Sequence, residues 1–141
     1  MRNKKISFRI MISMLCILLM TSMVALADNS EILSGAGPFE FSLYRGGDKK
    51  DSKPVRKTDN YNYARLEFQE FNNFDDLPLL YRLRSYTNDT TATGLYTVST
   101  VCTQRPVYNS GYGLNGYAYY IRIQTDSMST YSARTTGYWV P

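Results

Sequence analysis

Apolar and polar residues alternate along most of the chain beyond residue 37, and a two-residue period is typical of β-strands with one buried face. In the clearest case, Phe39, Phe41 and Leu43 share one face. Six segments show this alternation or a high content of β-branched residues: 39–43, 63–68, 79–84, 95–103, 117–123 and 130–139. They predict an all-β fold, a single small antiparallel β-sandwich of about six to eight strands, with a small barrel as the alternative.

The connections between these segments carry turn chemistry. The polar stretch 46–54 is expected to be a mobile loop, and Asn88 is expected to belong to a turn. Asn115-Gly116 predicts a type I′ hairpin turn, because both residues tolerate a positive φ. The stretch 67–78 breaks the alternation and is predicted to hold one helical turn.

Large side chains of the last two segments are expected to fill the core. In 117–123, Tyr117, Tyr119 and Ile121 alternate with polar or outward residues and are expected to face inward. Trp139 is expected to lie inside the sandwich, with its indole N–H hydrogen-bonded.

The beginning of the chain has the layout of a secretory signal peptide. Four basic residues precede an apolar run that starts at Ile10 and ends in the small-residue site Ala25-Leu26-Ala27. The run is nearly long enough for a permanent membrane anchor, but the A-x-A site and the polar residues after it favour cleavage after Ala27. We therefore expect a signal helix at 1–27, a flexible lead-in at 28–36, a β-sandwich domain at 37–141, secretion to the extracellular space and no stable membrane anchor after cleavage.

Cleavage changes the charge and the cysteine content of the protein. The whole chain carries 16 Lys and Arg against 12 Asp and Glu, and all four basic residues of the leader leave with it. The secreted chain is then neutral, so the formal charge of +4 gives no argument for nucleic-acid binding. Cys102 is the one cysteine that stays. We expect it to be a small buried apolar side chain in a monomer rather than the link of a dimer.

The absence of histidine excludes several kinds of site. Without histidine, Ser-His-Asp triads, histidine acid–base pairs and histidine-ligated zinc are ruled out. We therefore expect no catalytic residue, no metal site and no cofactor, and a protein that is not an enzyme. The remaining catalytic alternative is a glycosidase that uses carboxylates of the acidic cluster Glu67, Glu70, Asp75 and Asp76. Otherwise these residues form a solvated loop.

Arginine and tyrosine residues occupy the expected outer faces of two strands. Arg82, Arg84, Tyr120 and Arg122 are expected to point away from the core. Neighbouring arginine and tyrosine side chains stack and leave guanidinium donors for phosphate or carboxylate groups. These four residues are therefore candidate binding residues for a cell-wall polymer or glycan. The alternative is that they only stabilise the sheet.

The stretch 108–117 is a second candidate binding segment. Tyr108, Tyr112 and Tyr117 are interleaved with glycines, which is the composition of binding loops on rigid β scaffolds. The alternative is an ordinary glycine-rich turn whose tyrosines cover the edge of the core.

The leader, a mature domain of about 110 residues, Tyr- and Thr-rich strands and the ending T-T-G-Y-W-V-P together suggest a family. In this general plan the chain resembles small exported all-β proteins of Gram-positive bacteria (Firmicutes), some of them lactococcin-like. No diagnostic motif matches, so the resemblance implies an exported non-enzymatic protein and assigns no site residue. We predict a secreted binding protein that contacts the cell envelope or an extracellular glycan. The alternative is a bacteriocin-like toxin that acts on competing bacteria.

Overall fold

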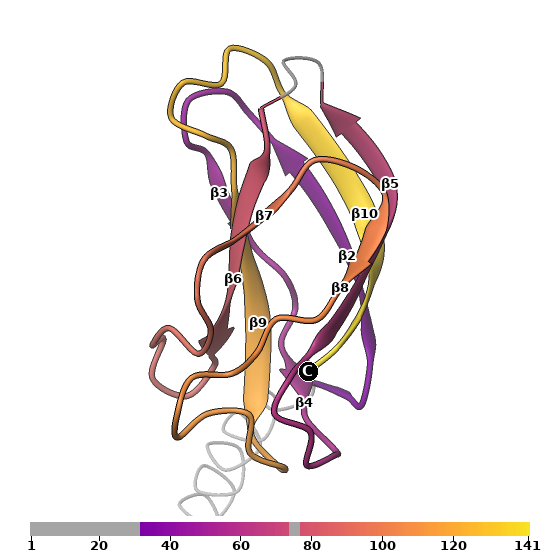
Figure 1. Ribbon diagram of the computed structural model, residues 1–141, viewed down its shortest axis with the longest axis vertical. Coiled ribbons are helices and arrows are strands. Elements are labelled where there is room, and N and C mark those ends of the chain that lie inside the picture. Colours follow the sequence, from indigo (N-terminus) through magenta and orange to yellow (C-terminus); the bar gives the residue numbers. More distant parts are fainter. Residues whose placement is uncertain (1–31, 74–76) are drawn as a thin grey trace, which may run out of the picture. The chain divides into compact units, whose positions relative to one another are not determined.

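The computed structural model describes residues 32–73 and 77–141, which form an all-β structure (Figure 1). This part of the chain contains ten strands, more than the six to eight predicted. It contains no helix long and apolar enough to cross a membrane. The expected signal peptide at 1–27 and the acidic residues Asp75 and Asp76 lie outside the described residues.

One sheet has six strands. They are β1 (Leu33–Ser34), β3 (Lys49–Asp51), β4 (Val55–Arg56), β6 (Leu79–Ser85), β7 (Tyr96–Val98) and β9 (Ala118–Gln124). The order is β1-β4-β9-β6-β7, and β3 also pairs with β9. All neighbours are antiparallel except β1 and β4, which run parallel. The central strand β9 therefore has β6 along one edge and β3 and β4 along the other.

The second sheet has four strands, all antiparallel. They are β2 (Gly37–Leu43), β5 (Arg65–Asn73), β8 (Cys102–Gln104) and β10 (Ala133–Val140). The order is β2-β10-β5-β8, so β10 pairs with β2 on one side and with β5 on the other. The strands β2 and β5 are therefore joined only through β10.

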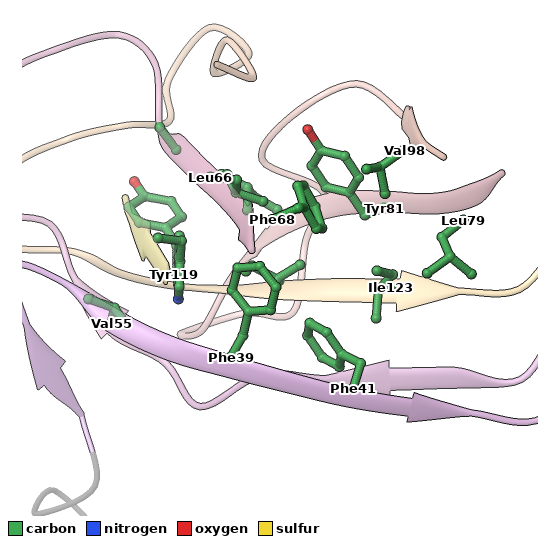
Figure 2. Packing of buried hydrophobic residues seen from close by; sticks show 14 of the residues in the cluster. Phe39, Phe41, Val55, Leu66, Phe68, Leu79, Tyr81, Val98, Tyr119 and Ile123 are labelled. Atoms are coloured by element: carbon green, nitrogen blue, oxygen red, sulfur yellow. The ribbon is translucent and has the colours of Figure 1, made fainter. Parts of the chain in front are cut away.

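The two sheets enclose one apolar core, as the alternation predicts. Phe39 and Phe41 of the four-stranded sheet and Tyr81 and Ile123 of the six-stranded sheet belong to the same buried cluster (Figure 2). The rings of Phe68 and Tyr81, which come from different sheets, lie 5.6 Å apart between centroids. Two antiparallel-rich sheets around a shared core are consistent with the predicted β-sandwich.

A β-bulge explains why the sequence loses its alternation after residue 67. Thr136 of β10 pairs with Glu70 of β5, and the next residue, Gly137, pairs with Phe68. Gln69 is therefore the extra residue of a bulge, and the strand continues through Asn73. The helical turn predicted over 67–78 is wrong for the described part of that stretch, because a bulge breaks the two-residue period without ending the strand.

Two other segments are organised differently from the prediction. The stretch 95–103 is not one strand, because β7 pairs with β6 in one sheet and β8 pairs with β5 in the other. Its middle residues cross between the sheets. The stretch 46–54, expected to be a mobile loop, contains β3, which pairs with residues 122–124 of β9. Charged side chains are tolerated on such a short edge strand because its faces are exposed.

The turn at Asn115-Gly116 and the start of the domain also differ from the prediction. Gly116 has a positive φ of 86° but Asn115 does not, so the turn is not type I′. The residues before it form no strand that pairs with β9, so it is not a hairpin turn. Within the expected lead-in 28–36, Leu33–Ser34 forms β1 and Leu33 packs against the core.

The buried aromatic residues are placed partly as expected. Trp139 is buried in the core, but its indole nitrogen has no hydrogen-bond partner among the described residues, contrary to the prediction. Tyr119 and Ile121 face the core, whereas Tyr117 precedes β9 and is 52 % exposed. Cys102 is a free thiol that is only partly buried against the core.

Candidate functional site

The predicted arginine and tyrosine residues come together on the outer face of the six-stranded sheet. Arg82 of β6 lies directly opposite Arg122 of β9, and Arg84 lies opposite Tyr120. Their strand neighbours Leu83 and Ile121 are buried, so these four residues lie on the outer face of the sheet, as predicted, but Tyr120 is only 7 % exposed and the three arginines are partly buried. Antiparallel pairing thus forms one cluster from residues that lie almost 40 positions apart in the sequence.

Asp51 fixes the guanidinium of Arg122. Nε and one Nη of Arg122 donate to the two carboxylate oxygens of Asp51, both at 2.7 Å. The register places Asp51 of β3 directly opposite Arg122. The guanidinium also lies 5.5 Å from the ring centroid of Tyr120. This bidentate pair explains why the short polar segment around 49–51 forms a strand.

Asp89 joins Arg84 to Tyr120. Its carboxylate accepts from Nε of Arg84 at 2.7 Å and from the hydroxyl of Tyr120, and it lies 3.7 Å from Arg122. Asp89 has a positive φ of 50° in the turn after β6, a conformation that aspartate adopts more readily than most residues. The turn therefore brings a carboxylate back over the sheet, onto the cluster of arginines.

These contacts shift the pKa values of three residues of the cluster, Asp89, Tyr120 and Arg122. The hydrogen bond from Tyr120, followed by that from Arg84, lowers the pKa of Asp89. Burial, with a further contribution from the bond to Asp89, raises the pKa of Tyr120. The bond to Asp51 raises the pKa of Arg122. At neutral pH these shifts keep Asp89 and Arg122 ionised and the phenol of Tyr120 neutral.

Arg82 differs from its two arginine neighbours. Its guanidinium makes no ion pair or hydrogen bond with any described residue, although Arg122 stands directly across from it. We call the outer face of the six-stranded sheet the cationic face. Its charged residues are Lys49, Arg56, Arg82, Arg84 and Arg122, with the acids Asp51 and Asp89. Basic residues outnumber acidic ones there, and Arg82 and Lys49, whose side chains have no partner among the described residues, are the groups available to an external anion.

The tyrosines of 108–117 serve mainly to build the fold. Tyr108 is 7 % exposed and packs against Tyr119 with ring centroids 5.0 Å apart. Tyr112 packs against the core, and its hydroxyl donates to Thr90 at 2.9 Å. Only Tyr117 of the three candidate tyrosines is exposed. The structure therefore does not gather these rings into one open surface, and the loop covers the edge of the core, as the alternative held.

The buried hydroxyls of Tyr108 and Tyr119 give opposite expectations for replacement by phenylalanine. The hydroxyl of Tyr108 is buried and has no hydrogen-bond partner in the described part of the chain. That of Tyr119 accepts from the main-chain N–H groups of Gly113 and Leu114, at 2.9 and 3.2 Å. We expect Tyr108→Phe to leave the free energy of unfolding at pH 7 unchanged or to raise it by about 1 kcal/mol. Tyr119→Phe should lower it by about 1–2 kcal/mol.

The same pair of variants tests the effect of alkaline pH. Burial raises the pKa of Tyr108 well above its ordinary value. Above pH about 10 the unfolded chain loses this proton while the folded chain keeps it, so stability falls as the pH rises. The free energy of unfolding of the Tyr108→Phe variant, measured by urea titration, should therefore fall less steeply above pH 10 than that of the unaltered protein. A Tyr108→Phe variant that is as unstable at pH 7 as Tyr119→Phe would contradict this account.

Lys57 is a residue whose position the sequence did not reveal. It follows the polar stretch 46–54, yet its side chain is 0 % exposed. Its ammonium donates to the carboxylate of Asp59 and, at 2.8 Å, to the main-chain oxygen of Pro141. It also lies 5.5 Å from the ring centroid of Tyr108. The available signal was the strand period, which places Lys57 on the same face as the buried Val55.

Glu67 and Glu70, the described acidic residues of the catalytic alternative, lie on the outer face of the four-stranded sheet. Glu67 is opposite Tyr138 and Glu70 is opposite Thr136. The carboxylate of Glu67 forms an ion pair with Arg65, whereas Glu70 is exposed. Neither carboxylate is buried in an apolar pocket, which is the environment that a general acid at neutral pH requires.

Comparisons with known proteins do not place the chain in a family. No family model, no curated protein and no solved structure matches it.

Proposed function

We propose that this protein is an exported, non-enzymatic binding module whose cationic face holds an anionic polymer of the cell envelope. Export rests on the leader at 1–27, which we expect to be cleaved after Ala27. Binding rests on one observation: the guanidinium of Arg82 has no acidic partner in the described structure and stands opposite Arg122. Arg122 is already paired with Asp51, so Arg82 carries the uncompensated charge of this strand pair, and an anionic ligand would neutralise it.

The rest of the cluster supports this role through rigidity. Arg84 and Arg122 are held by Asp89 and Asp51 with bonds of 2.7 Å. Fixed guanidinium groups lose little freedom when a ligand binds, so more of the interaction energy appears as affinity. A polymer with repeated phosphate or carboxylate groups would contact Arg82 first and the outer atoms of its neighbours next.

The first test measures retention of the purified protein on cell walls. We expect the protein to sediment with walls of a Gram-positive bacterium, and Arg82→Gln to weaken this binding roughly tenfold, which corresponds to ~1.4 kcal/mol for one charge-assisted hydrogen bond. Binding should also weaken as NaCl rises from about 0.05 to 0.5 M, because salt screens exposed charges.

Arg134→Gln is the matched control, because Arg134 is an exposed arginine on the other sheet. It should leave sedimentation unchanged. Walls stripped of phosphate-linked polymers by mild acid should lose the salt-sensitive component. Equal binding by Arg82→Gln and the unaltered protein would refute the cationic face as the site. Growth inhibition of related strains without sedimentation would favour the bacteriocin-like alternative instead.

A further inference from the structure

A run of shallow hollows lies over the four-stranded sheet, and at one end it reaches Asp51, Ser52 and Lys53 at β3 of the other sheet. The largest has a volume of about 520 Å³, and two others have about 220 Å³ each. Tyr138 lines the largest hollow and one of the smaller ones, and Arg65 lines both smaller ones. The hollows follow one another through these shared residues, and we take them together as one shallow groove. We call it the tyrosine groove, defined by Gln69, Thr136, Tyr138, Arg65, Tyr63 and Tyr61.

Aromatic rings are spaced along the tyrosine groove. Tyr138 lies opposite Glu67 on the outer face and is 50 % exposed. At the other end, the rings of Tyr61 and Tyr63 stack with centroids 5.3 Å apart and an angle of 23° between their planes. The guanidinium of Arg105 lies 5.6 Å from the ring centroid of Tyr63. Exposed tyrosines on regular strands and on a neighbouring stacked pair offer flat apolar surfaces with a polar edge.

The β-bulge lies beside the largest hollow of this groove. Gln69, the extra residue of the bulge, lines the largest hollow together with Thr136 and Gly137. A bulge bends its strand and redirects one side chain, and Gln69 is exposed at this bulge. Gln69 and Thr136 have no hydrogen-bond partner among the described residues through their side chains, so both are available to a ligand.

The charges of this face cancel. Its charged residues are Arg65, Arg105, Arg134, Glu40, Glu67 and Glu70, and Asp59, which also lines the groove, is paired with the buried Lys57. Arg134 pairs with Glu40 at 2.8 Å, and Arg65 pairs with Glu67. At the edge of the groove, Lys53 and Asp51 add one charge of each sign. A ligand that complements this surface is therefore uncharged, in contrast to the anion that suits the cationic face.

The chemistry of the groove fits a carbohydrate chain better than a peptide. The groove runs over the face of a sheet, where main-chain N–H and C=O groups point at neighbouring strands and are not open to a ligand. An extended peptide is normally recognised through such groups at a sheet edge. Sugar rings instead offer apolar C–H faces to tyrosine rings and hydroxyls to side chains such as Gln69 and Thr136.

We infer that the tyrosine groove is a second binding site, which takes an uncharged, linear oligosaccharide across the outer face of the four-stranded sheet. Tyr138 stacks against one sugar, and the Tyr61–Tyr63 pair stacks against another. Gln69 and Thr136 form hydrogen bonds with sugar hydroxyls at the bulge end of the groove. The inference goes beyond the proposed function, because its ligand is uncharged and its site meets the cationic face only at Asp51.

The test uses the hexamer of β-1,4-linked N-acetylglucosamine as the probe and isothermal titration calorimetry as the measurement. We expect the purified protein to bind the hexamer at least tenfold more tightly than the dimer, because only a long chain spans the groove. Tyr138→Ala and Tyr61→Ala should each weaken hexamer binding roughly tenfold, and Tyr138→Phe should preserve it. Binding should change less than about twofold between 0.05 and 0.5 M NaCl.

Tyr86→Ala is the matched control, because Tyr86 is 47 % exposed but follows a strand of the other sheet. It should bind the hexamer normally, as should Arg82→Gln, which separates this site from the cationic face. Equal affinity for dimer and hexamer, or full binding by Tyr138→Ala, would overturn the inference. So would binding of an uncharged extended decapeptide in place of the hexamer. Near-UV circular dichroism confirms that each variant is folded.

Discussion

Gly137→Ala is expected to lower the free energy of unfolding by about 3 kcal/mol, at the upper end of the cost of overpacking a core. Gly137 lies in β10 at the bulge and faces the core. A Cβ at this position would overlap the carbonyl oxygen of Glu67 and would lie 2.6 Å from Cζ of Phe39. A flexible side chain could move away, but a strand carbonyl held in a ladder cannot, so the β5–β10 pairing itself must shift.

Urea or guanidinium titration at pH 7 measures this change, with Gly94→Ala as the matched control. A Cβ on Gly94 would meet only Cε2 of Tyr96, at an ordinary 3.9 Å, so this variant should stay within about 0.5 kcal/mol of the unaltered protein. Small domains are stable by only about 5–15 kcal/mol, so Gly137→Ala removes a large share of the total. If both variants unfold at the same denaturant concentration, the close approach at Gly137 does not exist.

Asp59→Asn is expected to lower the free energy of unfolding by about 3 kcal/mol, because it leaves a buried ammonium without its counterion. Lys57 is fully buried and contacts the Asp59 carboxylate, the Pro141 main-chain oxygen and the Tyr108 ring. These contacts tie three distant segments together. An asparagine keeps one oxygen acceptor but no charge, so the loss reports the electrostatic part of the cluster.

Lys57→Met provides the counterpart, since it removes the buried charge and keeps an unbranched apolar side chain. Asp59 is one-third exposed and can be hydrated when its partner is lost, so we expect a smaller cost of about 1–2 kcal/mol. Asp51→Asn, which breaks the exposed pair with Arg122, should cost no more than about 1 kcal/mol. A larger loss for Lys57→Met than for Asp59→Asn would show that packing, not charge, dominates at this position.

The core of the fold was predictable from local sequence, because the strand period needs no knowledge of distant contacts. The alternation at 39–43 and 79–84 predicted strands and their buried faces, both of which the structure confirms. The stretch 95–103 was predicted less well, because β-branched residues favour a strand but do not determine which sheet it joins. The crossing between sheets after Val98 depends on partners far away in the chain.

The alternation predicted which residues lie on the outer faces of the sheets, but it did not predict which partners these residues contact. Arg84 and Arg122 do point outward, yet the sequence did not reveal that Asp89 and Asp51 neutralise them, because these pairs depend on strand register and on one turn conformation. Lys57 was missed because two of its three contacts lie more than 50 positions away. The bulge had two local signals, a broken alternation near Gln69 and an isolated glycine in a strand, and they are informative only when read together.

The central position of β10 has a consequence for how the chain is made. Residues 37–43 and 65–73 cannot complete their sheet until residues 133–140 have left the ribosome, because β10 separates β2 from β5. Such distant pairings form slowly, so a nascent chain would remain unfolded throughout most of translation. This late closure would be compatible with the export proposed above, because the chain would still be extended when most of its synthesis is complete.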